Sequence, residues 1–355
     1  MRRRKEDIEK IENSTTSSWY FFLIEDIMKD IITFGSATQD IYAKSRQFLS
    51  VLGKAFKTGE GICLTLGSKI ELDDLLLTSG GGGTNTAATF SNQGLKVAYC
   101  GQVGKDCFGT LIIREMKDLK IDLGLILESK NKPTNTSIFL AFPEKDRTVL
   151  VYRGASDDFN KKDIPWHKIK QAKWFYLAPF SGKLAILTQD LVSFAKKFKI
   201  KVAWNPGYNQ LEFPRSTLEK ILEKTDVLIL NRQEASLLSK IPSGEEKEIF
   251  RKLRKMTDGI VIMTKGGEGA LISGAKAKYI YEAPSLHSKF VDATGAGDAF
   301  GSGFVAGMIQ KNDIIFAIQL AMANSGFCVG KWGAKDGLLK KGQKWPKVKI
   351  RKKKL

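Results

Sequence analysis

The chain has 355 residues and a formal net charge of +19; 43% of its residues are hydrophobic and 27% are charged. This composition is typical of a globular protein with one large core. It contains no apolar run near the roughly 20 residues that a membrane-spanning helix needs. We therefore expect a cytoplasmic protein with no membrane partner.

Histidine and cysteine are too few or too scattered for several kinds of site. Only two histidines are present, His167 and His287, which argues against a histidine base or a histidine-rich metal site. The cysteines show neither paired metal-ligand spacing nor a disulfide framework, so we expect buried thiols. They are Cys63, Cys100, Cys107 and Cys328.

The positive charge is concentrated near the C-terminus, where ten lysines and arginines from Lys335 onward stand against one acid, Asp336. Basic tails bind polyanions through counterion release, and they also serve as solubilising ends. Because no zinc-finger, RNP-like or helix-turn-helix pattern accompanies this tail, we expect no specific nucleic-acid binding.

The first 27 residues differ from those that follow. Residues 1–27 are charged, then rich in serine and threonine, then aromatic, and we interpret them as an extension. Residues 31–35 follow as a short buried strand that ends in a glycine turn. Two alternatives stay open: either Met28 is the initiator, or the extension is an amphipathic addition.

After Asp40 the apolar pattern loses its helical period and is interrupted by glycine, which favours short antiparallel strands. The glycine run 80–85 and the motif 101–109 each lead into a helix. Alternation on both sides of residues 144–146 predicts a β-hairpin. The expected strands are 41–43, 61–66, 69–72, 96–100, 137–143 and 147–152; one expected helix starts near 87 and another covers 109–119.

From Trp166 onward, predicted strands and helices alternate regularly. Such alternation indicates a parallel sheet with helices on both faces, and ligands bind beyond the carboxyl ends of its strands. Asp40, Asn205, Asn231 and Thr264 all lie at such ends. The expected strands are 174–177, 201–205, 227–230, 259–264 and 270–273, and the expected helices are 183–198, 214–223, 233–238 and 246–256.

Residues 291–300, Val-Asp-Ala-Thr-Gly-Ala-Gly-Asp-Ala-Phe, place two glycines and an acid at the start of an apolar helix. A glycine turn that opens a helix leaves the first backbone N–H groups unpaired at the positive end of the helix dipole, which suits a phosphoryl group. Asp298, just inside this turn, can accept a proton from an attacking hydroxyl group. By themselves, the residues also allow a helix start whose glycines serve only packing.

With these motifs the chain resembles the ribokinase-like (PfkB) family of sugar and nucleoside kinases. Residues 292–300 match the most specific motif of that family, and residues 80–85 with 101–109 match its N-terminal motif. The likeness covers about residues 28–340. Two separate motifs in the right order make coincidence a poor explanation.

The resemblance implies an α/β fold: a ribokinase-like parallel-sheet, three-layer α/β/α core with a small β-sheet lid. The lid would come from residues 41–79 and 132–153, inserted in a kinase domain of residues 28–340. Residues 1–27 would be an N-terminal extension and residues 341–355 a basic C-terminal tail.

The resemblance also assigns the catalytic roles. It makes Asp298 the base that accepts the proton of the acceptor hydroxyl group, and it makes Gly295, Ala296 and Gly297 the anion hole for the transferred phosphoryl group. It implies ATP and Mg²⁺ as cofactors. Glu234 would place the magnesium ion through water, because Mg²⁺ keeps much of its hydration; alone, this residue is also a helix-start acid.

Cofactor-binding positions follow from the same resemblance. Asn205 would contact the triphosphate, although turn chemistry before proline also explains it. Asn231 opens the motif that contains Glu234. The loop 264–269 would approach the ribose and phosphates of the nucleotide, and the residues that match are Thr264, Gly266 and Gly269.

On the acceptor side, the resemblance makes Asp40 the acid that binds substrate hydroxyl groups, although it could instead cap a turn. Gly81, Gly82 and Asn85 match the substrate-binding glycine loop. Some family members also bind a monovalent cation such as K⁺. The corresponding loop here contains Asp292 and Thr294, together with backbone oxygens around Cys328, Lys331, Gly333 and Gly337.

Two departures from the family pattern bear on the acceptor. Residues 133–136, Pro-Thr-Asn-Thr, lack the arginine that members acting on phosphorylated sugars tend to carry, so one bidentate partner for a phosphate is missing. Residues 178–180, Ala-Pro-Phe, lack the acid of ribokinase-type members. The aromatic rings of Phe139, Tyr152 and Phe180 could stack on a base.

We therefore expect an ATP-dependent kinase whose acceptor is a small-molecule sugar, ribose-like, with a nucleoside such as adenosine as the alternative. A non-catalytic ligand- or polyanion-binding member of the fold is the alternative from another class. In this family the lid sheets often pair between subunits, so a homodimer through the lid is expected beside the alternative of a monomer.

Overall fold

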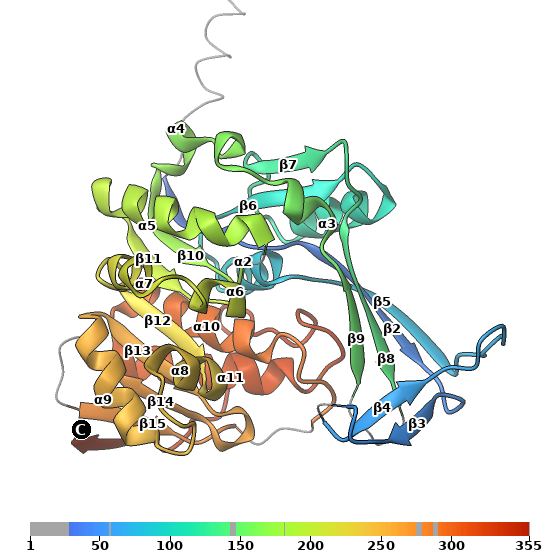
Figure 1. Ribbon diagram of the computed structural model, residues 1–355. Helices are drawn as coiled ribbons and strands as arrows, with labels where there is room; N and C mark the ends of the chain where they lie inside the picture. The colour runs from blue at the N-terminus through green and yellow to red at the C-terminus, as the bar shows by residue number, and fades with distance from the viewer. Residues whose placement is uncertain are drawn as a thin grey trace, which may run out of the picture.

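The computed structural model describes residues 28–56, 58–142, 147–180, 182–274, 279–286 and 290–354. The expected extension 1–27, the hairpin turn 144–146 and His287 lie outside the described residues. Figure 1 shows a large sheet with helices on both sides and a smaller sheet that projects from it on the right.

The large sheet has ten strands among the described residues, in the order β16-β15-β14-β13-β12-β11-β10-β1-β6-β7. Neighbouring strands are parallel from β7 to β13 and antiparallel from β13 to β16. The strands are β1 Lys29–Phe34, β6 Val97–Gly104, β7 Ile126–Ser129, β10 Ala172–Leu177, β11 Lys201–Trp204, β12 Val227–Asn231, β13 Ile260–Thr264, β14 Ala270–Ser273, β15 Tyr279–Ala283 and β16 Arg351–Lys354.

Helices cover both faces of this sheet, which confirms the expected α/β/α layering. One layer contains α5 Leu187–Lys197, α7 Arg215–Leu222, α8 Arg232–Ser239 and α9 Glu246–Met256. The other contains α2 Gly82–Asn92, α3 Cys107–Asp118, α10 Ala296–Lys311 and α11 Ile314–Cys328. The short helices α4 Trp166–Ile169 and α6 Tyr208–Leu211 complete the described set, with single 3-10 turns at Gly154–Asp158, Lys161–Asp163, Gly182–Ile186 and Gly266–Glu268.

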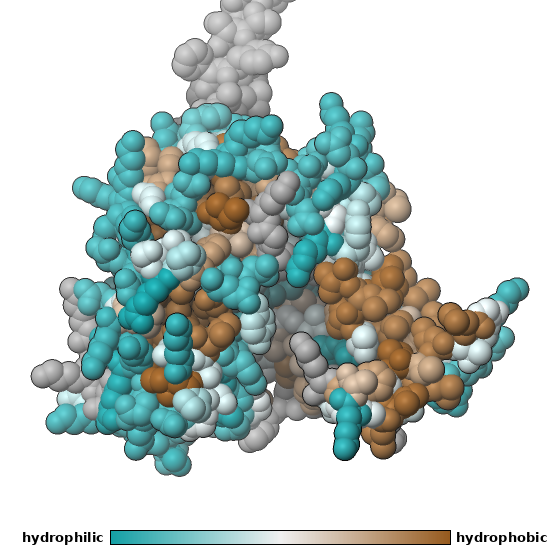
Figure 2. Space-filling view, viewed as in Figure 1, coloured by the Kyte–Doolittle hydropathy of each residue, from teal (hydrophilic) through white to brown (hydrophobic). Residues whose placement is uncertain are grey.

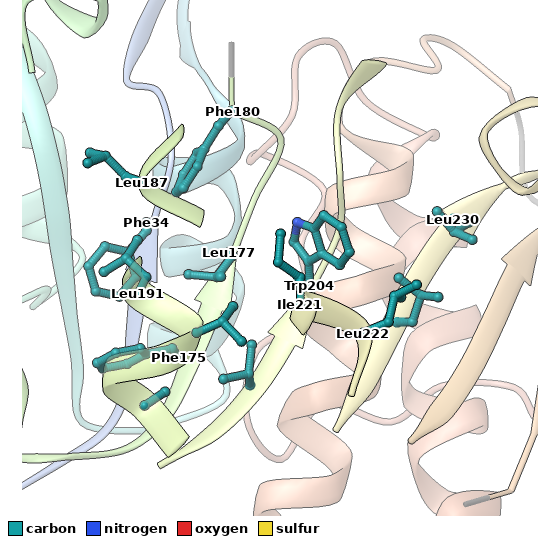
Figure 3. Close-up of a cluster of buried hydrophobic side chains, with 14 of the residues drawn as sticks. Phe34, Phe175, Leu177, Phe180, Leu187, Leu191, Trp204, Ile221, Leu222 and Leu230 are labelled. Carbon is teal, nitrogen blue, oxygen red and sulfur yellow. The ribbon is translucent and has the colours of Figure 1, made fainter. Parts of the chain in front are cut away.

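Successive residues of the central strands alternate between the two helix layers, as the twofold side-chain period of a strand requires. On one face Phe34, Phe175, Trp204 and Leu230 belong to a single buried cluster, part of which Figure 3 shows. On the other face Ile31, Trp174, Tyr176 and Ile229 belong to a second cluster. Burying each such side chain contributes about 1.5–3 kcal/mol, so the strand ends are carried by a rigid support.

Helices α10 and α11 pack against each other, and nine residues of each helix are buried. Glycine lets the two backbones approach closely: a Cβ at Gly307 would lie 2.6 Å from the Cα of Ala317, and one at Gly303 would lie 3.1 Å from the Cα of Ala321. This close packing fixes the position of the N-terminus of α10, which begins at Ala296.

The smaller sheet, called the lid here, has the strand order β5-β2-β8-β9. Its strands are β2 Thr38–Lys44, β5 Asp74–Gly80, β8 Asn135–Ala141 and β9 Thr148–Tyr152. The predicted hairpin of β8 and β9 is confirmed. Strand β2 pairs antiparallel with β5, in the expected sense, and in parallel with β8, a pairing that the sequence did not predict. A separate hairpin consists of β3 Leu49–Leu52 and β4 Glu60–Cys63.

Some local predictions were wrong or incomplete. Residues 69–72 form no strand; β5 begins only at Asp74, after the side chain of Asp73 has bound the backbone N–H and guanidinium of Arg46. The predicted strand at 96–100 continues to Gly104. Cys63 and Cys107 are exposed, contrary to the expectation of four buried thiols, because they lie on a projecting hairpin and at a helix start.

The basic C-terminal segment takes part in the fold. Its residues Arg351–Lys354 form β16, which pairs with β15 at the edge of the large sheet, and Lys353 forms an ion pair with Glu282. Among the described residues, no helix is both long enough and apolar enough to span a membrane.

Candidate active site

Three cavities adjoin one another at the carboxyl edge of the parallel strands. The lid cavity of about 400 Å³ lies between the lid and the core, and it shares Gly295 and Asp298 with a central cavity of about 200 Å³. The central cavity shares Thr264 and Gly297 with a third of about 340 Å³, the glycine-loop cavity. The turn at the start of α10 therefore lies where the three cavities meet and lines all of them.

This turn contains two glycines, and the structure requires only one of them for packing. Gly295 has φ 75°, and a Cβ there would lie 2.3 Å from the Cβ of Ala334, so only glycine fits. A Cβ at Gly297 would meet nothing within 4 Å. Packing therefore does not require the glycine at 297, and its missing side chain leaves room where the central and glycine-loop cavities meet.

The backbone donors of this turn differ from the expectation in one respect. The N–H of Ala296 donates to the carbonyl of Ala293 at 3.2 Å, so it is already paired. Within the part of the chain that the structure describes, the N–H groups of Gly297 and Asp298 have no acceptor in the protein, as expected for the first turn of a helix. These two donors are the ones available to an anion.

The carboxylate of Asp298 lies where the lid and central cavities meet, and it accepts a hydrogen bond of 2.9 Å from Nδ2 of Asn85 on α2. Burial raises the pKa of Asp298, while the Asn85 amide and the ammonium group of Lys335 oppose that rise. The other side-chain atom of Asn85, Oδ1, is buried without a partner among the described residues. An unpaired buried acceptor beside a cavity is a position where a ligand donor fits.

The lid cavity has polar walls from both of its sides. Asp40 on β2 is 5% exposed; burial raises its pKa to about 6, against a hydrogen bond from Ser137 and the charge of Lys335. The predicted Gly81, Gly82 and Asn85 also line the cavity. Further polar lining residues, which the sequence did not single out, are Ser36, Thr38, Asn135, Ser137 and Asn209.

The glycine loop before α2 brings its backbone close to the candidate base. Gly81 has φ 95°, and a Cβ there would lie 2.4 Å from the carbonyl oxygen of Ser36. A Cβ at Gly82 would lie 3.5 Å from Oδ1 of Asp298 and 2.9 Å from the Cβ of Ala178. Side chains here would fill the space next to the carboxylate, which explains why this stretch is glycine-rich.

The central cavity contains a reciprocal cap at the start of α8. The side chain of Asn231 accepts from the N–H of Glu234, and the carboxylate of Glu234 accepts from the N–H of Asn231, both at 2.8 Å. Burial raises the pKa of Glu234, and the charge of Asp298 adds to that effect. Asn205 and Thr264, also in this wall, donate to the carbonyls of Ile229 and Leu230.

No group of three or more His, Cys, Asp or Glu side chains within the described ranges could hold a metal ion by itself. The central cavity does contain two carboxylates, Glu234 and Asp298, with open volume between its walls. This donor set fits Mg²⁺, which accepts one or two carboxylates and takes its other ligands from water and phosphate oxygens. It does not fit a metal that needs a complete protein cage.

The glycine-loop cavity is mostly apolar and is bounded by the residues that follow β13. Gly266 has φ 58°, and a Cβ at Gly266 or Gly267 would meet nothing within 4 Å, whereas one at Gly269 would lie 2.0 Å from the carbonyl oxygen of Ala283. Ion pairs of Arg232 with Glu268 hold the loop over α8. Its apolar lining, which suits a flat ring system, consists of Leu286, Phe290, Phe300, Met322 and Val329.

Two residues expected at a cation loop lie beside these cavities. Thr294 lines the lid cavity, whereas Asp292 is buried behind it and lines none of the three. The Asp292 carboxylate is bound by Arg147 from the lid, at 3.3 Å between Nη1 and Oδ1. Cys328, Lys331, Gly333 and Gly337, also expected near the cation loop, line none of the three cavities, whereas every predicted catalytic, substrate-binding, cofactor-binding and magnesium residue lines at least one.

Sequence reasoning missed Lys335, whose ammonium group is buried between lid and core. It donates to Ser79 on β5 and to Glu115 on α3, the latter at 3.0 Å. Burial lowers the pKa of Lys335, and the nearby acids Glu115 and Asp40 oppose that shift. The only signal in the sequence was that Lys335 begins the basic C-terminal segment, where it had been grouped with the tail.

Comparisons with known proteins agree with this geometry. A family model described as the pfkB family of carbohydrate kinases matches residues 28–341. A ribokinase of Lactococcus lactis is 28% identical over 284 residues, which are 78% of this chain and 88% of that protein. A nucleoside kinase of Methanothermobacter thermautotrophicus is 25% identical over 264 residues, 74% of this chain and 82% of that protein.

Solved structures show the same fold. Arabidopsis thaliana ribokinase complexed with ribose and ATP superposes with a TM-score of 0.73 at 20% identity, covering 88% of this chain and 96% of that one. A putative ribokinase II of E. coli in complex with ATP and Mg²⁺ gives a TM-score of 0.72 at 20% identity, covering 87% and 96%. The expected ribokinase-like architecture is thereby confirmed.

Proposed function

This chain belongs to the pfkB family of carbohydrate kinases, and on that premise we propose that it transfers the γ-phosphoryl group of ATP to a hydroxyl group of a ribose-like sugar. It is a phosphotransferase with an alcohol group as acceptor. The observation that carries the proposal is the place of Asp298, at the boundary between the polar lid cavity and the central cavity, beside two unpaired N–H groups.

The proposed reaction makes and breaks one bond to phosphorus. The acceptor oxygen bonds the γ-phosphorus, the bond from that phosphorus to the β–γ bridging oxygen breaks, the hydroxyl proton passes to the carboxylate of Asp298, and ADP leaves. ATP would supply the phosphoryl group, and Mg²⁺ would screen its negative charge. Positioning and electrostatic stabilisation are the main contributions a protein makes to such a transfer.

The proposal assigns a role to each residue around Asp298. Asn85 holds the Asp298 carboxylate by its 2.9 Å hydrogen bond and leaves Oδ1 free to accept from a sugar hydroxyl group. The N–H groups of Gly297 and Asp298 stabilise negative charge on the transferred group. Glu234 faces the same cavity and would hold Mg²⁺ through water, and Asn205 and Thr264 complete the wall beside the triphosphate.

A nucleotide fits the glycine-loop cavity. Gly266, Gly267 and Gly269 allow close backbone approach, and the apolar lining beyond them can enclose an adenine ring. The structure of E. coli ribokinase II was solved with ATP and Mg²⁺, which supports both as partners of this fold.

The lid cavity favours a sugar as acceptor. Two of the three aromatic rings that could stack on a base are already committed: Phe139 stacks on Tyr42 with ring centroids 4.3 Å apart, and Phe180 is 4% exposed in the core. The remaining lining is rich in hydroxyl, amide and carboxyl groups, which match several sugar hydroxyls. Tyr152, half exposed at the cavity rim, keeps a nucleoside acceptor as the second candidate.

An acceptor panel tests the proposal. Ribose, fructose, 2-keto-3-deoxygluconate, adenosine, inosine and fructose 6-phosphate would be compared by ADP release with Mg²⁺–ATP, and the phosphorylated product would be identified by mass spectrometry. We expect the highest kcat/KM with ribose or a close analogue. A preference of tenfold or more for adenosine or inosine would overturn the sugar assignment and leave the kinase assignment standing.

We also propose that the lid pairs with the lid of a second copy. Figure 2 shows hydrophobic side chains gathered over the lid. Exposed leucines lie on its outer strands, with Leu75 at 54%, Leu77 at 50% and Leu150 at 51% exposure. Contiguous exposed apolar surface of this kind marks interaction sites.

Light scattering coupled to size exclusion measures the predicted dimer. We expect the mass of a dimer for the native chain and of a monomer for the double variant Leu77→Lys and Leu150→Lys. A native monomer at micromolar concentration contradicts the pairing. The expected cytoplasmic location stays a prediction.

A further inference from the structure

The carboxylate of Asp292 is enclosed and fully bonded. Its side chain is 1% exposed. Oδ1 accepts from the N–H and the hydroxyl group of Thr294, at 3.1 and 2.9 Å, and Oδ2 accepts from the hydroxyl group of Tyr42 and the N–H of Gly333, at 3.1 and 3.3 Å. A buried carboxylate also needs a positive charge, since an unpaired buried ion is unstable.

That positive charge comes from the lid. Nη1 of Arg147 lies 3.3 Å from Oδ1 of Asp292, and Nη2 donates to the hydroxyl oxygen of Thr294 at 3.0 Å. Arg147 directly precedes β9, and its guanidinium lies 5.7 Å from the ring centroid of Phe139. That ring stacks in turn on Tyr42, the other lid residue that binds Asp292.

A buried thiol lies beside two carbonyl oxygens near this loop. The sulfur of Cys328 lies 3.7 Å from the carbonyl oxygen of Thr294 and 3.6 Å from that of Ala334, so its single S–H can donate to either of them. Burial raises the pKa of this thiol to about 12, so it stays protonated and remains a donor. A monovalent cation in this loop would need the carboxylate of Asp292 as a ligand, and both oxygens of that carboxylate are already bonded while the guanidinium of Arg147 supplies the positive charge.

The residues of the 292–294 loop therefore do not fit the K⁺ site that the resemblance implied. We propose that the guanidinium of Arg147 is the resident counter-charge of Asp292, in place of a monovalent cation, and that phosphoryl transfer by this protein needs no K⁺. Arg147 acts as a positioning residue. It holds Asp292 and Thr294, which lead into Gly295 and the two free N–H groups at the start of α10.

This arrangement ties the lid to the anion-binding turn by direct contact. The lid reaches the loop with Arg147 and Tyr42, and the loop continues within six residues from Asp292 to Asp298. A shift of the loop would move the donors and the base together. Misplacement by about 1 Å costs on the order of 10²-fold in rate.

The first test is a cation titration of the native chain. KCl is raised from 0 to 100 mM against choline chloride at constant ionic strength, with activity and melting temperature as separate readouts. We expect both to stay unchanged. A severalfold rise in kcat, or a rise in melting temperature that K⁺ causes and Na⁺ does not, overturns the proposal. The melting readout does not depend on the proposed function, so a wrong acceptor cannot be mistaken for a failed inference.

The second test removes the guanidinium. Arg147→Ala should lower kcat by about 10²-fold with a smaller change in KM, and methylguanidinium or K⁺ should restore part of the rate. Arg147→Lys should retain more activity than Arg147→Ala, because lysine keeps the positive charge. If Arg147→Ala does not fold, the test relies on Arg147→Lys. Arg46→Ala is the matched control, because that lid arginine pairs with exposed Asp73. Native kcat in both Arg147 variants, or equal loss in the Arg46 control, contradicts the assignment.

Discussion

The two walls of the lid cavity are built on different principles. The core wall presents Asp298, Asn85 and Gly295 from the starts of α10 and α2, two helices that pack against each other and against the large sheet. The lid wall presents Asp40 and Ser137 from strands of a four-stranded sheet whose outer residues are exposed leucines. Under the proposed function, the groups of the transfer step lie on the rigid core wall, and the groups that select the acceptor lie on the lid wall.

This difference teaches how the two functions can be separated. A change at Asp298 or at the N–H groups beside it should lower the transfer rate without changing acceptor binding greatly. A change on the lid wall should weaken acceptor binding and leave the transfer step with most of its rate. Three substitutions test this division, beginning with the largest expected effect.

Asp298→Asn should lower kcat by about 10²–10⁴-fold, because the amide cannot accept the hydroxyl proton. The melting temperature and ATP binding should stay near the native values, since Asn85 can still bond the side chain. Kinetics, thermal denaturation and nucleotide titration measure the three quantities. Asp226→Asn is a matched control at the amino-terminal end of β12, where the carboxylate accepts from Val202. A native rate in Asp298→Asn would remove the proposed base.

Gly297→Ala should separate activity from stability in opposite directions. A Cβ there meets no protein atom within 4 Å but enters the space of the two adjoining cavities, so kcat should fall by about 10²-fold. Alanine in place of glycine in a helix should raise the free energy of unfolding by about 0.5–1 kcal/mol. Gly307→Ala should have the opposite effects, because its Cβ would clash with Ala317. The free energy of unfolding should fall, and the folded fraction should keep the native kcat. Chemical denaturation alongside kinetics checks both.

Asp40→Asn should raise the KM of the acceptor by about 10–100-fold with a smaller effect on kcat, because a hydrogen bond to a charged group contributes about 1.5–3 kcal/mol. Asp74→Asn, on exposed lid strand β5, is the control. A fall in kcat with an unchanged KM would place Asp40 in the transfer step and contradict the prediction that the lid wall acts in acceptor binding.

The pH dependence of Asp40 sharpens the same comparison. Its folded-state pKa of about 6 lies above the ordinary 3.8, so the folded chain binds this proton more tightly than the unfolded chain. The free energy of unfolding should therefore fall, relative to Asp40→Asn, as the pH rises from about 4 to about 6. The acceptor KM of the native chain should rise below pH 6, where Asp40 loses its charge, and that of the variant should not. Parallel curves for the two proteins would show that Asp40 does not titrate in this range.

Much of the part of the site that the core contributes could be predicted from the sequence. The turn 292–298, the cap between Asn231 and Glu234 and the glycine loop 264–269 each depend on residues close together in the chain. Helix starts, caps and positive-φ turns are decided by such local contacts. The alternation of strands and helices after Trp166 likewise predicted the parallel part of the sheet and the edge at which the site lies.

The tertiary structure alone decided the contacts between distant segments. The parallel pairing of β2 with β8, the burial of Lys335 between Ser79 and Glu115 and the ion pair of Arg147 with Asp292 join residues that are far apart in the chain. No local pattern predicts such pairs, because the partners meet only after the lid has packed on the core, where their attraction and hydrogen bonds offset the cost of removing them from water. The start of α10 was therefore predictable as a glycine turn that opens a helix, whereas the ion pair of Arg147 with Asp292 became visible only in the folded chain.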